Sequence, residues 1–151
     1  MKVTKKGDYA LRALVDLALN YGKGMRHIQD IVHGEAIPQK FLEQILILLK
    51  NGGFIQSKRG VKGGYFLNRP PDEISLGEVI RCIDGPLAPL DCVSMSLHFN
   101  CPREVTCGIR SVMLDVGNAT AEIMDRVTLE DVCNRTKGVA ERRSEHLMYH
   151  I

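Results

Sequence analysis

The sequence lacks a hydrophobic run that could cross a membrane. Its longest uninterrupted apolar run, Ile45 to Leu49, is far shorter than the roughly 20 residues that a membrane-spanning helix needs. No apolar segment follows the lysines near the N-terminus, so we expect no secretory signal. These absences predict a cytoplasmic protein without a membrane partner. Its 5 cysteines should then be reduced and available for metal or redox chemistry, which excludes a disulfide framework.

Motifs that mark common enzyme classes are also missing. The glycines between Gly60 and Gly64 fall in a predicted hairpin. A phosphate-binding loop would place them between a strand and a helix. No local spacing of Cys, His and Asp suggests a nucleophile with its base. A thiol-dependent enzyme is therefore the least favoured function, and we do not expect an enzyme.

The charge is divided unevenly along the chain. The 151 residues carry a net charge of +2 and have a composition ordinary for one globular domain. Residues 1–70, however, contain 12 Lys or Arg and 5 Asp or Glu, whereas residues 71–151 contain 8 and 13. A basic half joined to an acidic half indicates that the first half meets a polyanion. The alternative is a chance distribution of solvated charges.

The basic half has the element order of a winged helix-turn-helix. Small and apolar residues at helical spacing predict a first helix that ends near Gly22, with a polar side made of Asp8, Arg12, Asp16 and Asn20. A short helix over residues 27–33 and a longer one over 38–51 follow. Two short strands, 54–57 and 65–67, then enclose a loop with three glycines and three cations. We therefore predict a mainly α fold, with a winged helix-turn-helix DNA-binding domain over residues 1–85.

Two groups of polar residues are the candidates for contact with double-stranded DNA. In this fold the second helix of the pair enters the major groove, and its exposed N-terminal residues meet base edges. Those residues are Gln39, Lys40, Glu43 and Gln44, whose side chains suit adenine, guanine and cytosine. The loop cations, Lys58, Arg59 and Lys62, suit phosphates or a minor groove. Each group alone could be an ordinary solvated surface, and their combination favours DNA.

The acidic half predicts a dimer. A capping box of Ser75 and Glu78 opens a helix that ends at Asp84-Gly85-Pro86. An irregular, cysteine-containing loop follows over residues 86–107. Apolar residues then recur at spacings of 4, 3, 4, 3 and 4, at Ile109, Met113, Val116, Thr120, Ile123 and Val127. This seam could pack on its own domain, but pairing with a second copy is favoured. We expect this dimerisation helix and a short terminal helix within 108–135, and a loosely ordered tail over 136–151. The short helix should span residues 128–133, with Thr128 as its N-cap and Asp131 at the third helical position.

Three cysteines lie together in the irregular loop. Cys92, Cys101 and Cys107 are separated by eight and five residues, which is not a zinc-finger spacing. Three soft thiolate donors in one loop suit zinc, copper(I) or an iron–sulfur cluster, whereas the alternative is three unrelated thiols. The spacing leaves these two interpretations open. Cys82 and Cys133 fall in predicted helices and are expected to be packed thiols.

The chain resembles the Rrf2 family of bacterial winged-helix regulators, which includes the IscR, NsrR and RirA types. The matching segments are GDYALRALVDLA, FLEQILILLKNGGFIQSKRGVKGGYFLNRPPDEISLGEVIRCIDG and the three cysteines that follow. The resemblance implies a homodimer joined by the long helix, with DNA contacts from the 38–51 helix and the wing. Glu43 and Arg59 stand at DNA-contacting positions of the family. Pro38 and Lys40 replace serines of the IscR type, which implies a different operator.

The same resemblance implies an iron–sulfur cluster on the loop, with [4Fe-4S] favoured over [2Fe-2S]. Its ligands would be Cys92, Cys101 and Cys107. Arg110 stands where the IscR type has a ligating histidine, so the fourth ligand must come from elsewhere. Candidates are Asp8 of the partner subunit, which is favoured, His98, or a ligand from solution. Asp8 could instead only favour the start of its helix, and His33 could lie near the site as a structural residue.

The predicted function is therefore a dimeric transcriptional regulator, with a repressor favoured. Its operator affinity would depend on the cluster, which would sense nitric oxide, redox state or iron supply. The alternative is a winged-helix regulator without a cluster that senses through thiols or a partner protein.

Overall fold

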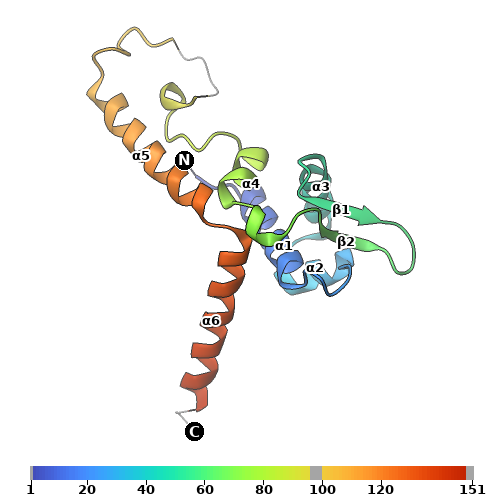
Figure 1. The fold of residues 1–151 in the computed structure, drawn as a ribbon. Coiled ribbons are helices and arrows are strands. Elements are labelled where there is room, and N and C mark those ends of the chain that lie inside the picture. Colours follow the sequence, from blue (N-terminus) through green and yellow to red (C-terminus); the bar gives the residue numbers. More distant parts are fainter. Residues whose placement is uncertain (1, 96–99, 149–151) are drawn as a thin grey trace.

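The computed structural model describes residues 2–95 and 100–148. They form six α-helices, two strands and two short 3₁₀-helices (Figure 1). In chain order these are α1 (Lys5–Leu19), α2 (Ile28–Glu35), α3 (Gln39–Asn51), β1 (Ile55–Lys58), β2 (Gly64–Leu67), η1 (Pro71–Glu73), α4 (Leu76–Ile83), η2 (Asp91–Val93), α5 (Gly108–Arg126) and α6 (Leu129–Met148). The predicted mainly α, winged-helix fold is confirmed.

The core is built around α1. This helix contacts α2, α3, α4 and the start of α6, because its small residues Ala10 and Ala13 are fully buried and let the neighbouring helices approach closely. The helices α2 and α3 form the predicted helix-turn-helix. Ala36 makes the turn between them in the left-handed conformation, at φ 52°. Pro38 then occupies the N-cap of α3.

The wing is an antiparallel hairpin that is anchored at its base. The strands pair with Ile55 opposite Leu67 and Lys58 opposite Gly64. The first strand is shifted by one residue from the predicted 54–57, and the second begins one residue before the predicted 65–67. Backbone hydrogen bonds of 3.0 and 2.8 Å join Arg26 to Tyr65 and attach β2 to the α1–α2 connection. A Cβ on Gly64 would lie 2.6 Å from the Arg26 carbonyl oxygen. Glycine is therefore required where these two backbones meet.

The helices α4 and α6 begin at predicted caps. The Ser75 hydroxyl accepts a 3.2 Å hydrogen bond from the Glu78 N–H. The other half of this capping box does not form, because the Glu78 carboxylate accepts a 2.6 Å bond from Arg69 instead. Thr128 and Asp131 cap α6 reciprocally, with bonds of 2.9 Å and 3.2 Å between each backbone N–H and the other side chain.

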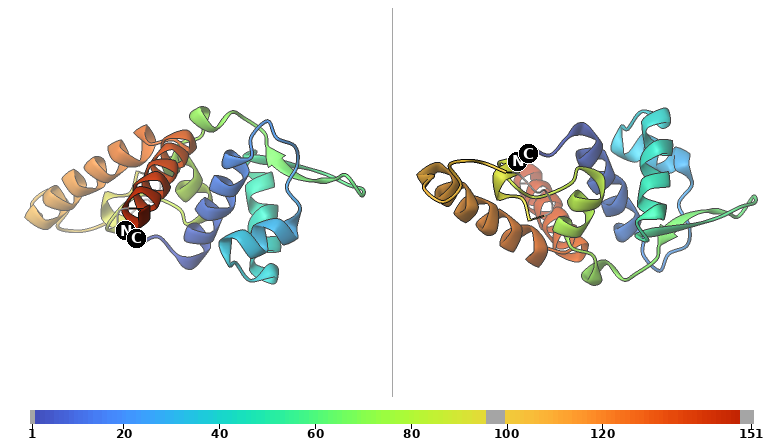
Figure 2. Two further views of the ribbon diagram at one scale, coloured as in Figure 1. Left: turned by 90° about the horizontal axis from the view of Figure 1, so that it is seen from below. Right: turned by 90° about the horizontal axis from the view of Figure 1, so that it is seen from above.

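The C-terminal segment is more helical than predicted. We expected a short helix over residues 128–133 and a loosely ordered tail over 136–151, but α6 continues to Met148. Its first turns pack on α1 and η1, where Leu129 and Cys133 are buried, and its remainder projects from the body (Figures 1 and 2). Lys, Arg, Glu and Ala are strong helix formers, so a polar sequence without proline extends the packed turns. No helix among residues 2–95 and 100–148 is long and apolar enough to span a bilayer.

Candidate nucleic-acid interface and cysteine loop

The helix α3 has one buried side and one solvent side. Leu42, Ile45, Leu46 and Leu49 are buried against the core. The four predicted base-reading residues, Gln39, Lys40, Glu43 and Gln44, are all exposed. The core contacts thus fix the orientation of the helix, and the same packing presents its polar side to solvent.

A short chain of hydrogen bonds orders part of this polar side. The Gln29 side chain on α2 donates a 3.0 Å bond to the Gln39 side chain. Gln39 in turn donates a 3.0 Å bond to the Glu43 carboxylate. Sequence reasoning missed Gln29, because its partner is ten residues away across the turn. The contact ties both helices of the motif to the orientation of Glu43.

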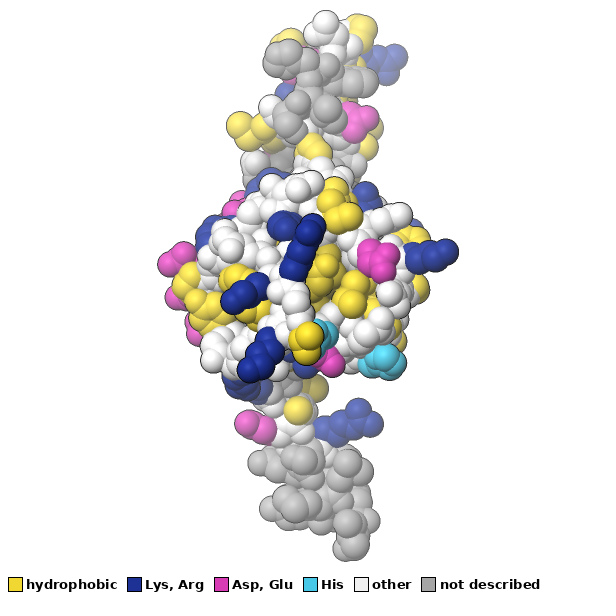
Figure 3. All heavy atoms as spheres, turned by 90° about the vertical axis from the view of Figure 1, so that its right-hand side faces the viewer, with side chains coloured by type: hydrophobic (Ala, Val, Ile, Leu, Met, Phe, Trp, Pro, Cys, Tyr) yellow, Lys and Arg dark blue, Asp and Glu magenta, His cyan; other side chains and the backbone are white. Residues whose placement is uncertain are grey.

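The wing places its cations at an exposed tip. Lys58, Arg59 and Lys62 are all exposed. A Cβ on Gly63 would collide with the backbone of Lys58 and Arg59, so the turn of this loop requires glycine there. Lys50 of α3 donates a 2.8 Å hydrogen bond to Ser57 of β1, which connects the wing to α3. Figure 3, which faces the wing side, shows Lys and Arg side chains gathered there with few acidic ones among them.

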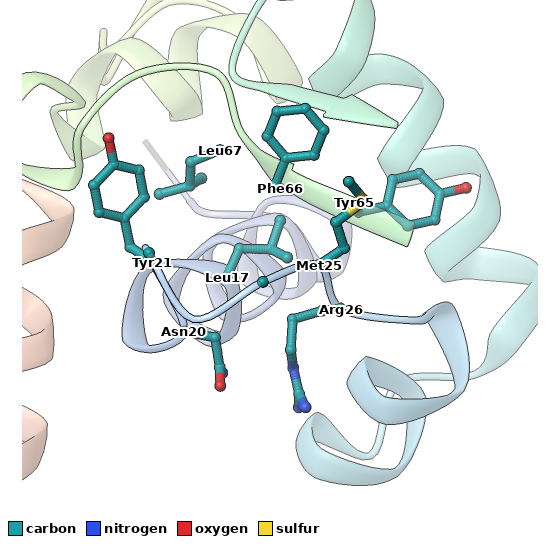
Figure 4. Close-up of a pocket in the computed structure, with 10 residues that line it drawn as sticks. Leu17, Asn20, Tyr21, Met25, Arg26, Tyr65, Phe66 and Leu67 are labelled. Carbon is teal, nitrogen blue, oxygen red and sulfur yellow. The ribbon is translucent and has the colours of Figure 1, made fainter. Parts of the chain in front are cut away.

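The base of the wing rests on a buried ion pair that sequence reasoning missed. Asp16, predicted on the polar side of its helix, is 7% exposed. It accepts bonds of 2.8 and 3.0 Å from Arg26, and this hydrogen bonding raises the pKa of Arg26. Arg26 also lines a largely apolar pocket of about 280 Å³ between α1, the loop after it and β2 (Figure 4). The Arg26 guanidinium thus holds the α1–α2 connection against α1. The backbone of the same residue pairs with β2 of the wing.

The helix α4 joins the DNA-binding unit to α5. At its C-terminal end, the Asp84 carboxylate accepts bonds of 2.9 and 2.5 Å from the backbone N–H and hydroxyl of Thr4, the N-cap of α1. On its outer side, Arg81 donates bonds of 2.5 and 2.8 Å to Asp125 of α5. The hydrogen bonds from Arg81 lower the pKa of Asp125. A continuous set of polar contacts therefore runs from α5 through α4 to α1.

Two of the three loop cysteines converge on Arg110. The Arg110 Nε donates a 3.2 Å hydrogen bond to the backbone oxygen of Cys92. Its backbone N–H lies 3.5 Å from the Cys107 sulfur, which caps α5. Its guanidinium forms a 2.9 Å ion pair with Glu104. Arg110 thus joins the backbone near Cys92 to the start of α5 at Cys107.

Among the described residues, the loop cysteines do not come together as a metal site. Cys92, Cys101 and Cys107 are all free and partly exposed. Within residues 2–95 and 100–148, no three His, Cys, Asp or Glu side chains lie close enough together to hold a metal ion. The other candidate in the loop, His98, lies outside the described residues. Three thiolates from one loop are nevertheless a donor set that suits an iron–sulfur cluster.

Asp8, the predicted fourth ligand, lies in the first turn of α1 and forms local ion pairs. Its carboxylate accepts a 2.9 Å bond from Arg12 and lies 3.6 Å from Lys5. The bond to Asp8 raises the pKa of Arg12. Asp8 also lines an open depression beside Lys2 and Leu11. His33 is engaged elsewhere, with its Nδ1 2.6 Å from the Gln29 carbonyl oxygen on α2.

The remaining cysteines differ from each other. Cys133 is buried as predicted, and burial raises the pKa of its thiol. Cys82 is exposed, which contradicts its prediction as a packed thiol. Its sulfur lies beside Gly52 at the end of α3, and the apolar residues Val79, Ile80 and Ile83 take the buried positions of α4.

Three of the six predicted seam residues of α5 are open to solvent in the single chain, whereas Met113, Thr120 and Val127 are half-buried. Ile109, Val116 and Ile123 are 67%, 46% and 55% exposed, and α5 has no buried residue. An exposed row of large apolar side chains on one helix is typical of an interaction surface. The chain therefore leaves uncovered the surface that the seam pattern assigned to a second copy.

Comparison with known proteins identifies the family. The Rrf2 family model, described as an iron-dependent transcriptional regulator, matches residues 3–135. An rrf2-like HTH-type transcriptional regulator of Rhodobacter capsulatus is 38% identical over 136 residues, which cover 86% of this chain and 91% of that protein.

Solved structures agree. CymR, the global cysteine regulator of Bacillus subtilis, matches with a TM-score of 0.75 and 31% identity over 89% of this chain and 98% of CymR. IscR of T. potens matches with a TM-score of 0.71 and 30% identity over 90% and 88%. The predicted family is confirmed: the chain belongs to the Rrf2 family of transcriptional regulators.

Proposed function

We propose that this protein is a dimeric repressor that binds double-stranded operator DNA and that an iron–sulfur cluster sets its operator affinity. The observation that carries the DNA-binding part is the side-by-side placement of the polar side of α3 and the cationic wing. Lys50 and Ser57 connect these two elements directly. A helix for the major groove and a cationic loop for the backbone or minor groove are the two contacts that a winged helix needs.

The reading residues have distinct roles in this proposal. Lys40 donates to guanine and Gln44 pairs with adenine, while Glu43, held by Gln39, accepts from a cytosine amino group. Lys58, Arg59 and Lys62 neutralise phosphates or enter the minor groove. The basic first half supplies the attraction, and the acidic second half keeps the rest of the molecule away from DNA.

The proposed dimer forms along α5. Burial of Ile109, Val116 and Ile123 against their copies would remove the largest exposed apolar row of this helix from water. A two-fold dimer presents two reading helices and therefore binds an operator of two related half-sites.

The proposed cluster is held by Cys92, Cys101 and Cys107, with Asp8 of the partner subunit as the fourth ligand and [4Fe-4S] as the favoured type. The description of the matching family as iron-dependent supports it, as does the convergence of the loop ends on Arg110. When bound, such a cluster supplies iron that reacts with oxidants or nitric oxide. The carboxylate is a harder and weaker partner for iron than a thiolate, so Asp8 would be the labile ligand.

The contacts of α4 provide a route from the loop to the DNA-binding helix. Cys107 caps α5, α5 is held to α4 by Arg81 and Asp125, and α4 is held to α1 by Asp84. Since α1 packs against α3, a shift of the loop on cluster loss would reach the orientation of α3. Two states of the dimer with different operator affinities would result.

A second candidate function is thiol-based sensing without a cluster. The free, partly exposed state of the three loop cysteines supports it, as does the likeness to the cysteine regulator CymR. In that case oxidation of the thiols, or a partner protein on the loop, would act on the same α5–α4–α1 route.

Anaerobic purification separates the two candidates. We expect a coloured protein with visible absorbance, with iron and sulfide bound in equal amounts, and with an operator affinity that changes when the cluster is removed. A colourless protein that still binds operator, and whose binding responds to thiol oxidants, would establish the second candidate instead.

A further inference from the structure

One large apolar side chain lies in the middle of the polar side of α3. Ile47 is 59% exposed. At the 100° per residue of an α-helix, the buried set of Leu42, Ile45, Leu46 and Leu49 centres on one side, and Ile47 lies close to the opposite side. Its neighbours on that surface are Glu43 and Gln44, one turn toward the N-terminus, and Lys50 and Asn51, one turn toward the C-terminus. Lys40 lies one turn beyond Glu43 and Gln44.

Folding of the chain gives no reason for isoleucine at this position. The exposed side chain gains little from burial, and a β-branched residue is a weaker helix former than alanine. The flanking positions on this side of α3, Lys40, Glu43, Gln44 and Lys50, are all polar. An apolar residue in the centre of a surface that otherwise suits DNA therefore points to an apolar feature of the bound DNA.

We propose that Ile47 is a specificity-determining residue that packs on the 5-methyl group of a thymine in the major groove. The inference rests on the proposed binding of operator DNA by α3. Among the base edges in the major groove, the thymine methyl is the apolar feature, whereas the other groups are hydrogen-bond donors and acceptors. Lys40, Glu43 and Gln44 read those polar groups, and Ile47 adds an apolar interaction that they cannot make.

The geometry of α3 limits where that thymine lies. Seven residues separate Lys40 from Ile47, which is about 10 Å along a helix axis. The base-pair rise is about 3.4 Å, so the thymine lies within about three base pairs of the pair that Lys40 contacts. The two-fold dimer requires one such thymine in each half-site.

The test starts from DNA that the protein itself selects. Wild-type protein is used to enrich its operator from a random duplex library, and each thymine of that operator is then replaced in turn by deoxyuridine. This change removes the methyl group and leaves base pairing intact. We expect about a fourfold loss of affinity at one thymine in each half-site, the size expected for one buried methyl group. Other thymines should change affinity much less.

The variant Ile47→Ala completes the comparison. It should bind the thymine duplex as weakly as the wild type binds a duplex with deoxyuridine at both of these thymines, one in each half-site, and it should lose nothing further on that doubly substituted duplex. Ile47→Val should keep most of the discrimination. Val139→Ala, which removes a similarly exposed β-branched side chain on α6, is the matched control and should bind like the wild type. Thermal unfolding of Ile47→Ala should be unchanged or slightly higher, because alanine favours the helix.

The outcomes are distinguishable. If Ile47→Ala loses the same factor on thymine and deoxyuridine duplexes, or if no deoxyuridine weakens the wild type, Ile47 does not read a methyl group. If one of these results is obtained with an operator that Arg59→Ala binds weakly, DNA binding stands and only this inference fails. Enrichment of no sequence at all would overturn the inference together with the proposed function.

Discussion

The winged-helix unit and the helix α5 differ in how completely they bury their own apolar residues. The unit from α1 to β2 encloses a core in which Leu14, Ile31 and Leu42 are fully buried. The helix α5 has no buried residue, and its apolar row faces solvent. The winged-helix unit therefore closes its core together with α4 and the start of α6, whereas α5 exposes an apolar row that the single chain does not cover. This contrast explains why a small winged-helix unit is combined with the long helix α5.

The largest expected effect comes from a charge in the α5 seam, which tests whether the exposed apolar row is a dimer interface. Val116→Asp should give soluble monomers with unchanged helix content, because an unpaired charge cannot enter an apolar interface and the core lies elsewhere. Operator affinity should fall about 100-fold or more, because a monomer binds only one half-site. Sedimentation and gel-shift titration measure both effects.

Val139→Asp, which places the same charge on the projecting part of α6, is the control and should stay dimeric. A wild-type protein that sediments as a monomer, or a Val116→Asp protein that sediments as a dimer, would contradict the assignment of the seam.

The next effect concerns the cysteine loop. Cys101→Ala should abolish the visible absorbance of anaerobically purified protein and leave the far-ultraviolet circular dichroism intact, because the loop contributes little to the core. Cys82→Ala removes an exposed thiol of α4 outside the loop and should keep the full spectrum. Equal spectra for the two variants would remove Cys101 from the ligand set.

A smaller effect is expected in the wing. Arg59→Ala should weaken operator binding about 30-fold, the size of an arginine interaction of about 1 kcal/mol lost in each of the two half-sites. It should also flatten the dependence of log K on log salt by about 1 for each phosphate that the variant no longer neutralises. Arg143→Ala removes an exposed arginine of α6 as the control. Unchanged affinity and salt dependence in Arg59→Ala would place the wing away from DNA.

The proposed bridge between subunits gives a kinetic effect. Asp8→Ala should retain a cluster, alter its spectrum and shorten its lifetime in air a few-fold, because the weakest ligand is replaced by an external one. Arg12→Ala breaks the 2.9 Å ion pair with Asp8 and keeps the carboxylate, so its cluster should decay at the wild-type rate. If both variants decay alike, the ion pair explains the effect. If Asp8→Ala matches the wild type, His98 is the next ligand to test.

The sequence predicted the local features of the first half well, because turns and helical periodicity are encoded within a few residues. The longer helix was expected over residues 38–51 and spans Gln39–Asn51. The exposure of Lys40 and Glu43 followed from the same pattern. Their binding to bases remains a prediction.

Features that depend on distant residues could not be predicted in this way. Asp16 has the spacing of a polar-side residue, but Arg26, ten residues later, buries it in an ion pair. Arg69 likewise takes the Glu78 carboxylate away from its cap. The length of α6 was missed for a different reason: polarity was interpreted as disorder, although Arg, Glu and Ala favour a helix.

The smallest expected effect is on the free energy of unfolding. It compares the winged-helix unit with α5 by replacing one alanine in each with glycine. Ala36 holds the turn between α2 and α3 in the left-handed conformation, at φ 52°, which costs an alanine about 1–2 kcal/mol. Ala36→Gly should therefore raise the free energy of unfolding by about 0.5–1 kcal/mol after the entropic cost of ordering glycine is subtracted. Ala119→Gly, at an exposed position inside α5, should lower it by about 1 kcal/mol. Urea titration at one fixed protein concentration compares the two, because dimerisation makes stability depend on concentration. Operator affinity should not change in Ala36→Gly, since the turn keeps its conformation. A loss of stability in both variants would mean that residue 36 is not left-handed and that α3 is oriented by a different turn.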